Sequence, residues 1–174
     1  MIDAHLSLIS NYWISGGSAL AEQQSPVTWQ IKHHSELGVA DVYAALKLRS
    51  AVFVVEQNCV YTDIDGLDML GETRHLLAWQ GDTLVAYLRL LDPAQNDSNV
   101  VIGRVVTDPS ARGTGLGHKM MGHALEACAE YWSELPIYMS AQAHLQGYYG
   151  RYGFVACSEI YLEDGIEHVG MRRL

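Results

Sequence analysis

Residues 100–125 read Val-Val-Ile-Gly-Arg-Val-Val-Thr-Asp-Pro-Ser-Ala-Arg-Gly-Thr-Gly-Leu-Gly-His-Lys-Met-Met-Gly-His-Ala-Leu, and this stretch decides the fold. Val100–Thr107 is rich in β-branched residues and ends at Asp108-Pro109, which predicts a strand followed by a turn. Apolar residues at three- and four-residue steps then predict a long helix that begins near Gly115. They are Leu116, Met120, Met121, Ala124, Leu125, Cys128 and Trp132.

The loop Arg112–Gly117 joins this strand to this helix. The start of a helix presents unpaired N–H groups and the positive end of its dipole, and glycines let the backbone curl around a phosphate. Two common phosphate motifs are absent, because a Rossmann fingerprint needs glycine where His118 stands and a P-loop needs a Gly-Lys pair that the chain lacks. The spacing predicts an anion-binding loop, and a glycine-rich turn without a ligand is the alternative.

A second motif lies at residues 148–154, which read Tyr-Tyr-Gly-Arg-Tyr-Gly-Phe. Gly147 and Gly150 fall inside a short helix predicted over Ala143–Tyr152, where each costs about 1 kcal/mol relative to alanine. That cost indicates close approach of another group to the backbone. Packing of the tyrosines against the sheet is the alternative.

The two motifs, Arg-x-x-Gly-x-Gly and aromatic-Tyr-x-x-x-Gly-Phe, resemble those of the GCN5-related N-acetyltransferase (GNAT) superfamily. The resemblance implies an α/β (α+β) fold, with a mixed central sheet of about six to seven strands flanked by helices and splayed at the strand before the loop. It also implies acetyl-CoA as acyl donor, with no metal. The cofactor-binding residues would be Arg104, Val105, Val106, Arg112, Gly113, Thr114, Gly115, Leu116, Gly117 and Tyr149.

By the same resemblance, Tyr149 lies near the cofactor sulfur and protonates the departing thiolate. A tyrosine with a pKa near 10 can donate to a thiolate whose conjugate acid has a pKa of about 8.5. Several further runs look like the ElaA family of small bacterial proteins, whose substrates are poorly defined. These are residues 52–57, 63–68, 102–105, 141–146 and 163–166. Many superfamily members carry Asn near the start of the second motif, where this chain has Ala-Gln, so we transfer no Asn-dependent contact.

The rest of the pattern predicts one domain over residues 28–174. Further strands are expected at Thr28–Lys32, His75–Trp79, Thr83–Leu91, Pro136–Ser140, Phe154–Ala156, Glu159–Leu162 and His168–Arg172. Another helix is predicted near residues 39–53, with Val39, Val42, Leu46, Arg49 and Phe53 on one face. Residues 1–27 contain no Lys or Arg, so we expect a flexible N-terminal extension rather than a targeting segment.

The segment Glu56–Glu72 is acidic and predicts a loop. Together with its flanking arginines it resembles the front half of acyl-homoserine lactone synthases, which share the superfamily's core. The matching residues are Arg49, Phe53, Asp63, Asp65, Asp68, Arg89 and Arg104. This resemblance implies that Arg49, Asp65, Asp68 and Arg89 position a small amine acceptor. A solvated loop with structural ion pairs is the alternative.

The superfamily mechanism implies that a primary amine attacks the thioester while both substrates are bound. Glu56 and His75 are the candidate bases for the amine proton. Two other functions stay open: a lactone-synthase-like acyltransferase supplied by an acyl carrier protein, and a non-catalytic coenzyme A-binding domain.

The composition limits which classes of binding partner and which cellular location we expect. The 174 residues carry a net charge of −9, which argues against nucleic acid and anionic membrane surfaces and suits a cationic small-molecule or peptide amine. No run approaches the ~20 apolar residues of a membrane span. The three cysteines are widely spaced without metal-ligand spacing, so we expect free thiols in the cytoplasm. The hairpin Ile160–Met171 is a candidate homodimer contact.

Overall fold

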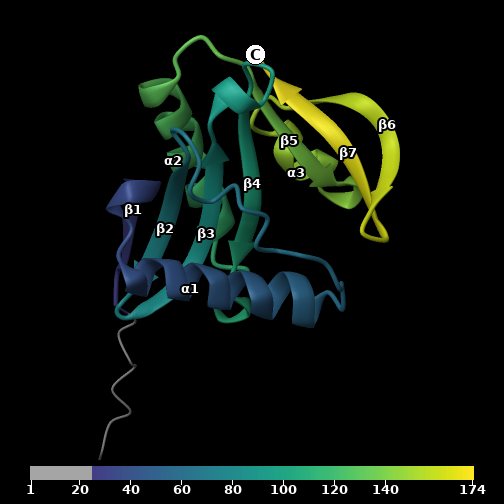
Figure 1. Cartoon of the computed structure of the whole chain (residues 1–174). Coiled ribbons are helices and arrows are strands. Elements are labelled where there is room, and N and C mark those ends of the chain that lie inside the picture. The colour runs from purple at the N-terminus through teal and green to yellow at the C-terminus, as the bar shows by residue number, and fades with distance from the viewer. Residues whose placement is uncertain (1–24) are drawn as a thin grey trace, which may run out of the picture.

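Seven strands form one sheet in the computed structural model, which describes residues 25–174 (Figure 1). Most of the predicted N-terminal extension therefore lies outside the described residues. In chain order the elements are β1 (Val27–His33), α1 (Val39–Arg49), β2 (Arg74–Gln80), β3 (Thr83–Leu91), β4 (Val100–Thr107), α2 (Leu116–Tyr131), β5 (Ile137–Gln142), α3 (Gln146–Gly150), β6 (Val155–Glu163) and β7 (Ile166–Arg173).

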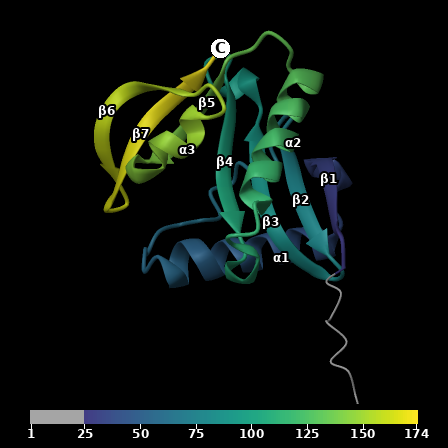
Figure 2. The same cartoon turned by 180° about the vertical axis from the view of Figure 1, so that it is seen from behind.

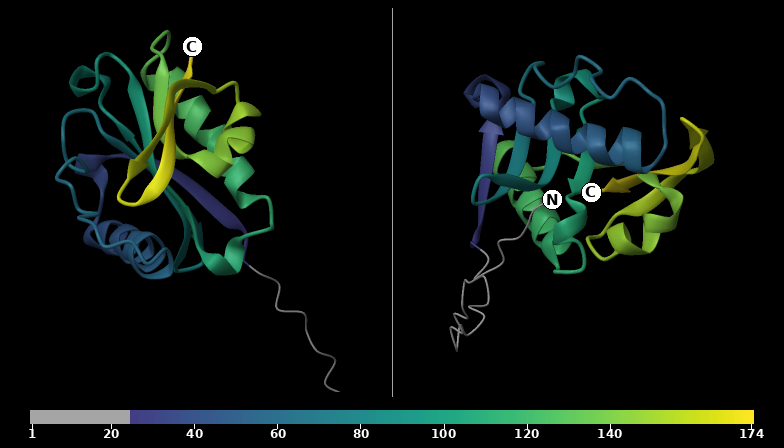
Figure 3. Two further views of the ribbon diagram at one scale, coloured as in Figure 1. Left: turned by 90° about the vertical axis from the view of Figure 1, so that its right-hand side faces the viewer. Right: turned by 90° about the horizontal axis from the view of Figure 1, so that it is seen from below.

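The strand order across the sheet is β1-β2-β3-β4-β5-β7-β6. Every neighbouring pair is antiparallel except β4 and β5, which are parallel. Helix α1 lies on one face, and α2 and α3 lie on the other (Figures 2 and 3). The predicted mixed sheet flanked by helices is confirmed.

Strands β4 and β5 separate soon after they begin. They pair only at Val100 with Ile137 and at Val101 with Tyr138, so β4 from Ile102 to Thr107 has no strand partner on its β5 side. This is the predicted splay before the glycine loop. It leaves backbone donors and acceptors of β4 facing an opening in the sheet.

A bulge at Arg104 changes which face the residues of β4 present. Ile102 packs in the core under α2, whereas Val106, four positions later, packs in the core under α1. In an unbroken strand both would face the same side. Arg104 has a φ of 55°, and the pairing with β3 shifts register here, so the bulge turns the rest of β4 over.

Several predicted elements are corrected. The predicted face of α1 is wrong at Val39, which is 88% exposed. The buried apolar residues of this segment are Ala45, Leu48 and Val52, which the prediction did not include. The chain continues beyond α1 as a π-helical segment over Ser50–Glu56, which changes the helical period. The strands predicted at 154–156 and 159–162 are one strand, β6, with a register shift inside it. The helix predicted over 143–152 is a 3₁₀ turn followed by the short α3. None of the described helices is long and apolar enough to cross a membrane.

Candidate active site

The glycine loop occupies the predicted position between β4 and α2. Gly113 has a φ of 77° and Gly115 a φ of 82°, a left-handed backbone that other residues adopt only at a cost. Gly115 is the N-cap of α2, and no side chain caps this helix end. The first N–H groups of α2 are therefore left for an anion, at the positive end of the helix dipole.

A cleft of about 500 Å³ runs along this loop. Its wall contains Arg112, Gly113, Gly115, Leu116 and Gly117 from the loop and α2, Val105 and Val106 from β4, and Tyr148 and Tyr149 from α3. Thr114 is not on the wall; its Oγ1 donates a hydrogen bond of 2.7 Å to the Ala111 carbonyl and holds the turn. A Cβ on Gly117 would lie 3.1 Å from the Tyr148 hydroxyl, so glycine allows α2 and α3 to approach.

A second cavity of about 320 Å³ lies in the opening between β4 and β5 and reaches the turn between β6 and β7. Arg104 lies on this wall rather than in the cleft along the loop. The two spaces share Val105, Leu145 and Tyr149. A ligand in the loop cleft can thus meet a second ligand at these three residues.

Tyr149 stands at this junction and is 5% exposed. Burial raises the pKa of its hydroxyl to about 12, which keeps it protonated at neutral pH. Within residues 25–174 no side chain or backbone group hydrogen-bonds this hydroxyl. Its proton is therefore free for a group at the junction.

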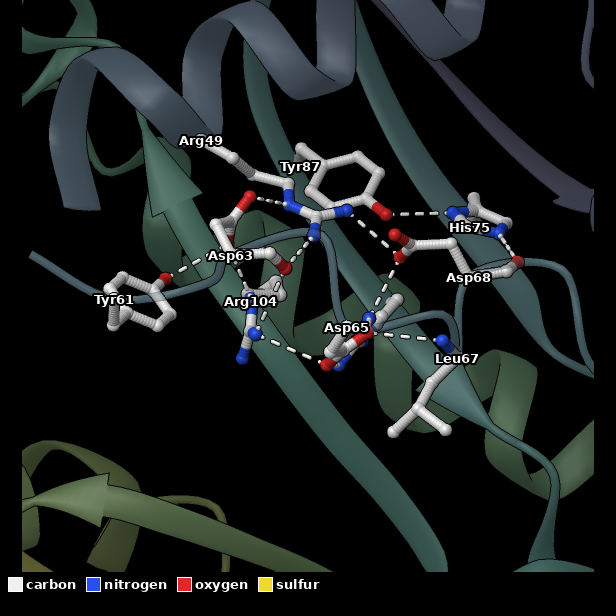
Figure 4. A network of polar contacts seen from close by, with 10 residues as sticks. Arg49, Tyr61, Asp63, Asp65, Leu67, Asp68, His75, Tyr87 and Arg104 are labelled. Carbon is white, nitrogen blue, oxygen red and sulfur yellow. Dashed lines mark hydrogen bonds and ion pairs between the residues drawn. The ribbon is translucent and has the colours of Figure 1, made fainter. Parts of the chain in front are cut away.

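A network of ion pairs, which we call the Arg–Asp network, extends from the cavity wall into the interior (Figure 4). It consists of three arginines and three aspartates, so its charges balance: Arg49, Asp63, Asp65, Asp68, Arg89 and Arg104. Arg49 is 1% exposed and contacts Asp63 at 2.9 Å and Asp68 at 2.8 Å. Asp68 also accepts from Arg89 at 2.8 Å, which joins α1 to β3 through the acidic loop.

Arg104 joins the network from β4. Its Nε lies 2.7 Å from Asp63, and its Nη2 lies 3.1 Å from Asp65. Burial alone would raise the pKa of Asp65, but the hydrogen bond from Arg89 and the nearby charges lower that pKa to about 2. Against the same effect of burial, hydrogen bonds from arginines also lower the pKa of Asp68, so the carboxylates of Asp65 and Asp68 are held as anions.

Comparison with known proteins identifies the family. Residues 32–174 match the family model described as acetyltransferase (GNAT) domain. The chain belongs to the GNAT acetyltransferase family. It is 51% identical to Protein ElaA of Escherichia coli over 147 residues, which cover 84% of this chain and 96% of ElaA. This confirms the predicted ElaA-like membership.

Solved GNAT-type structures resemble the chain. An acyl-CoA N-acyltransferase from Pseudomonas aeruginosa superposes with a TM-score of 0.84 at 57% identity, covering 86% of this chain and 100% of that one. The coenzyme A-dependent acyl-homoserine lactone synthase BjaI gives a TM-score of 0.68 at 17% identity, covering 84% and 82%. The second likeness concerns the fold alone. As a GNAT acyltransferase the protein uses an acyl-CoA donor and an amine acceptor.

The residues of the loop cleft fit an acyl-CoA donor. The glycine backbone and the uncapped start of α2 suit a pyrophosphate, and Arg112 supplies a positive charge. The edge of β4 that has no β5 partner includes Val105, which lines both the cleft and the second cavity. Within residues 25–174 no group of three or more His, Cys, Asp and Glu side chains is arranged to hold a metal ion.

The predicted acceptor residues divide into two groups. Arg89 lies on the cavity wall, whereas Arg49, Asp65 and Asp68 lie behind it in the Arg–Asp network. Direct contact of these three with an acceptor stays a prediction that this geometry does not favour. Arg49 instead links α1 to the acidic loop.

Neither predicted base lies on the cavity wall. His75 is 2% exposed, and both ring nitrogens are engaged, by the Tyr87 hydroxyl at 2.7 Å and the Asp68 carbonyl at 2.9 Å. Burial lowers the pKa of His75, so the ring is a neutral core residue. Glu56 makes two contacts with Arg112, at 2.7 and 2.9 Å, and this hydrogen bonding lowers the pKa of Glu56. The structure therefore argues against both residues as the base.

Sequence reasoning missed much of the cavity's far wall. The overlooked polar residues are Gln57, Tyr61, Ser140, Glu163 and His168. Gln57 and Tyr61 come from the segment between α1 and β2. Ser140, Glu163 and His168 are brought together by the placement of β7 between β5 and β6, which no local sequence pattern predicts. Only the resemblance of residues 163–166 to the ElaA family pointed to this turn.

Proposed function

We propose that the protein transfers an acetyl group from acetyl-CoA to the primary amine of a small-molecule or peptide acceptor, by direct attack within a ternary complex. The observation that carries this proposal is the meeting of two spaces at Val105, Leu145 and Tyr149. One space suits the coenzyme A chain and the other an acceptor. Both substrates can therefore be present together, and proximity supplies much of the rate.

The chain's own groups supply three functions. Arg112 and the loop backbone hold the pyrophosphate, and an N–H of β4 at Val105 or Val106 polarises the thioester carbonyl. The amine nitrogen bonds to the carbonyl carbon as the carbon–sulfur bond breaks. Tyr149 gives its proton to the departing sulfur and is then reprotonated from solvent, which takes up the amine proton. Acetyl-CoA, when bound, supplies the activated acyl group.

Titration calorimetry with acetyl-CoA tests the first part of this proposal. We expect micromolar binding that weakens about tenfold in Arg112→Ala, since a charge-assisted contact to phosphate is lost. Thiol release against pooled primary amines, with the acetylated product identified by mass, tests the second part. Binding without amine-dependent thiol release would favour a non-catalytic coenzyme A-binding domain, and turnover with only an acyl carrier protein would favour the lactone-synthase-like alternative.

A further inference from the structure

Arg104 keeps one side of its guanidinium unused. Its Nε and Nη2 donate to Asp63 and Asp65, but its Nη1 has no acceptor among residues 25–174 (Figure 4). The side chain is 21% exposed and lies on the wall of the second cavity. The network thus fixes the orientation of Arg104 and leaves two N–H donors available.

Arg89 adds a second unused donor on the same wall. Arg89 is 2% exposed, and its Nε is buried without a hydrogen-bond partner among the described residues. Gly103 lies beside it, and a Cβ there would be 3.8 Å from this Nε. A buried N–H without an acceptor costs free energy, so an acceptor atom entering from the cavity would be stabilised.

Arg104 lies next in sequence to a residue at which the cavity and the loop cleft meet. Arg104 directly precedes Val105, which lines both the cavity and the loop cleft. Its left-handed φ of 55° is an unusual conformation for arginine, held by contacts to Asp63 and Asp65. Arg104 and Val105 thus line one cavity of about 320 Å³, so a carboxylate on Arg104 and an amine at Val105 fit within one small molecule.

The opposite wall carries negative charge. Glu163 accepts a hydrogen bond of 2.7 Å from Ser140, which orients its carboxylate, and it forms no ion pair with any described residue. The aspartates of the Arg–Asp network, by contrast, are all held by arginines, whereas Asp164, which also lines the cavity, forms no ion pair with any described residue. The cavity therefore offers cationic donors on β4 and β3 and a carboxylate on β6.

We propose that the acceptor is a free α-amino acid or a close amino-acid analogue, with its carboxylate on Arg104 and Arg89 and its amine between Val105 and the Glu163 wall. This inference rests on the proposed function and names the acceptor class for it. A polyamine would leave the unused arginine donors unmatched, and a peptide N-terminus carries an amide in place of the carboxylate. A zwitterion satisfies both walls.

The test compares matched acceptors on the full chain with acetyl-CoA. Each set contains an L-amino acid, its carboxamide and its decarboxylated amine, and thiol release is confirmed by product mass. We expect kcat/KM to be at least about tenfold higher for the amino acid than for its two analogues, the effect of one charge-assisted contact. Equal or higher values for the amine or the carboxamide overturn the inference and leave the proposed function intact. No turnover with any primary amine overturns the proposed function itself.

Two variants locate the effect. Arg104→Lys keeps the charge but removes the unused Nη1 donors, and we expect it to reduce the preference for the amino acid over its carboxamide. Glu163→Gln lies on an exposed strand, so it keeps the fold if Arg104→Lys does not, and we expect it to raise the KM for the amino acid. An unchanged preference in folded Arg104→Lys together with an unchanged KM in Glu163→Gln would overturn the assignment of the two walls. Thermal melting checks that each variant is folded.

Discussion

The Arg–Asp network and the glycine loop lie on either side of the same opening, yet they are built in opposite ways. In the buried part of the network every nitrogen of the Arg49 guanidinium is bonded to Asp63 or Asp68, and Arg49 is 1% exposed; only Arg89 and Arg104, on the cavity wall, keep donors free. In the loop the backbone carries the site, and the start of α2 is left uncapped. A region that satisfies its own groups serves as a scaffold, whereas one that leaves donors free serves a ligand.

The largest effect is expected from breaking the network at Arg49. Arg49→Met leaves Asp63 and Asp68 short of a partner in a buried setting, and removal of one side of a buried ion pair costs about 3–5 kcal/mol of unfolding free energy. Urea denaturation measures this loss. Lys47→Met, at an exposed position on the same helix, is the control and should change stability by no more than about 0.5 kcal/mol. A loss at Arg49 as small as the control's would mean that the network is not the scaffold.

A substitution at Tyr149, in the ligand-binding region, should lower activity without lowering stability. Tyr149→Phe keeps the ring in the core but removes the proton donor, so kcat should fall about 10²-fold or more while the KM for acetyl-CoA and the melting temperature change little. Tyr152→Phe is the control, because its hydroxyl bonds His118 at 2.5 Å and lines neither space. An unchanged kcat in Tyr149→Phe would remove Tyr149 as the acid.

Since its pKa is about 12, ionisation of Tyr149 should cause no loss of kcat below about pH 10.

The two regions also differ in how well the sequence predicts them. The loop and its helix follow from local rules, because glycine spacing, a strand before it and an apolar stripe after it are all contiguous. The boundaries of β3 and β4 were predicted residue for residue, and α2 begins one residue after Gly115. The inward residues Met120, Met121 and Ala124 were likewise found from helical spacing.

The network and the second cavity depend on contacts between distant segments, and here prediction fell short. The need of Arg104 for a carboxylate from the acidic loop was foreseeable, because an arginine within an apolar strand requires a partner. That Arg49 and Asp68 would not line the cavity was not foreseeable, because their placement depends on how α1 and the acidic loop pack against β3. The contact between Glu56 and Arg112 was missed for the same reason: it joins residues 56 positions apart.

Acid titration sharpens the comparison with a smaller effect. The folded pKa of Asp65 is about 2, below its ordinary value of 3.8, so its contribution to stability is present above pH 3.8 and is lost as the pH falls toward 2. We expect Asp65→Asn to be less stable than the unmodified protein at pH 7, with the difference shrinking between pH 3.8 and about 2. Urea denaturation at each pH measures this. A difference that stays constant down to pH 2 would show that the Asp65 carboxylate is not held as an anion by the network.

The smallest effect tests the one place where the loop resembles the network. Glu56 forms a two-contact ion pair with Arg112, and both side chains are 42% exposed, so solvent screens the pair. A pyrophosphate on Arg112 has to compete with this carboxylate. Glu56→Gln should therefore tighten coenzyme A binding by about two- to fivefold in titration calorimetry, with the gain shrinking at high salt. Weaker binding in Glu56→Gln would mean the reverse: that Glu56 holds Arg112 in its binding position, and that the loop, like the network, depends on an internal partner.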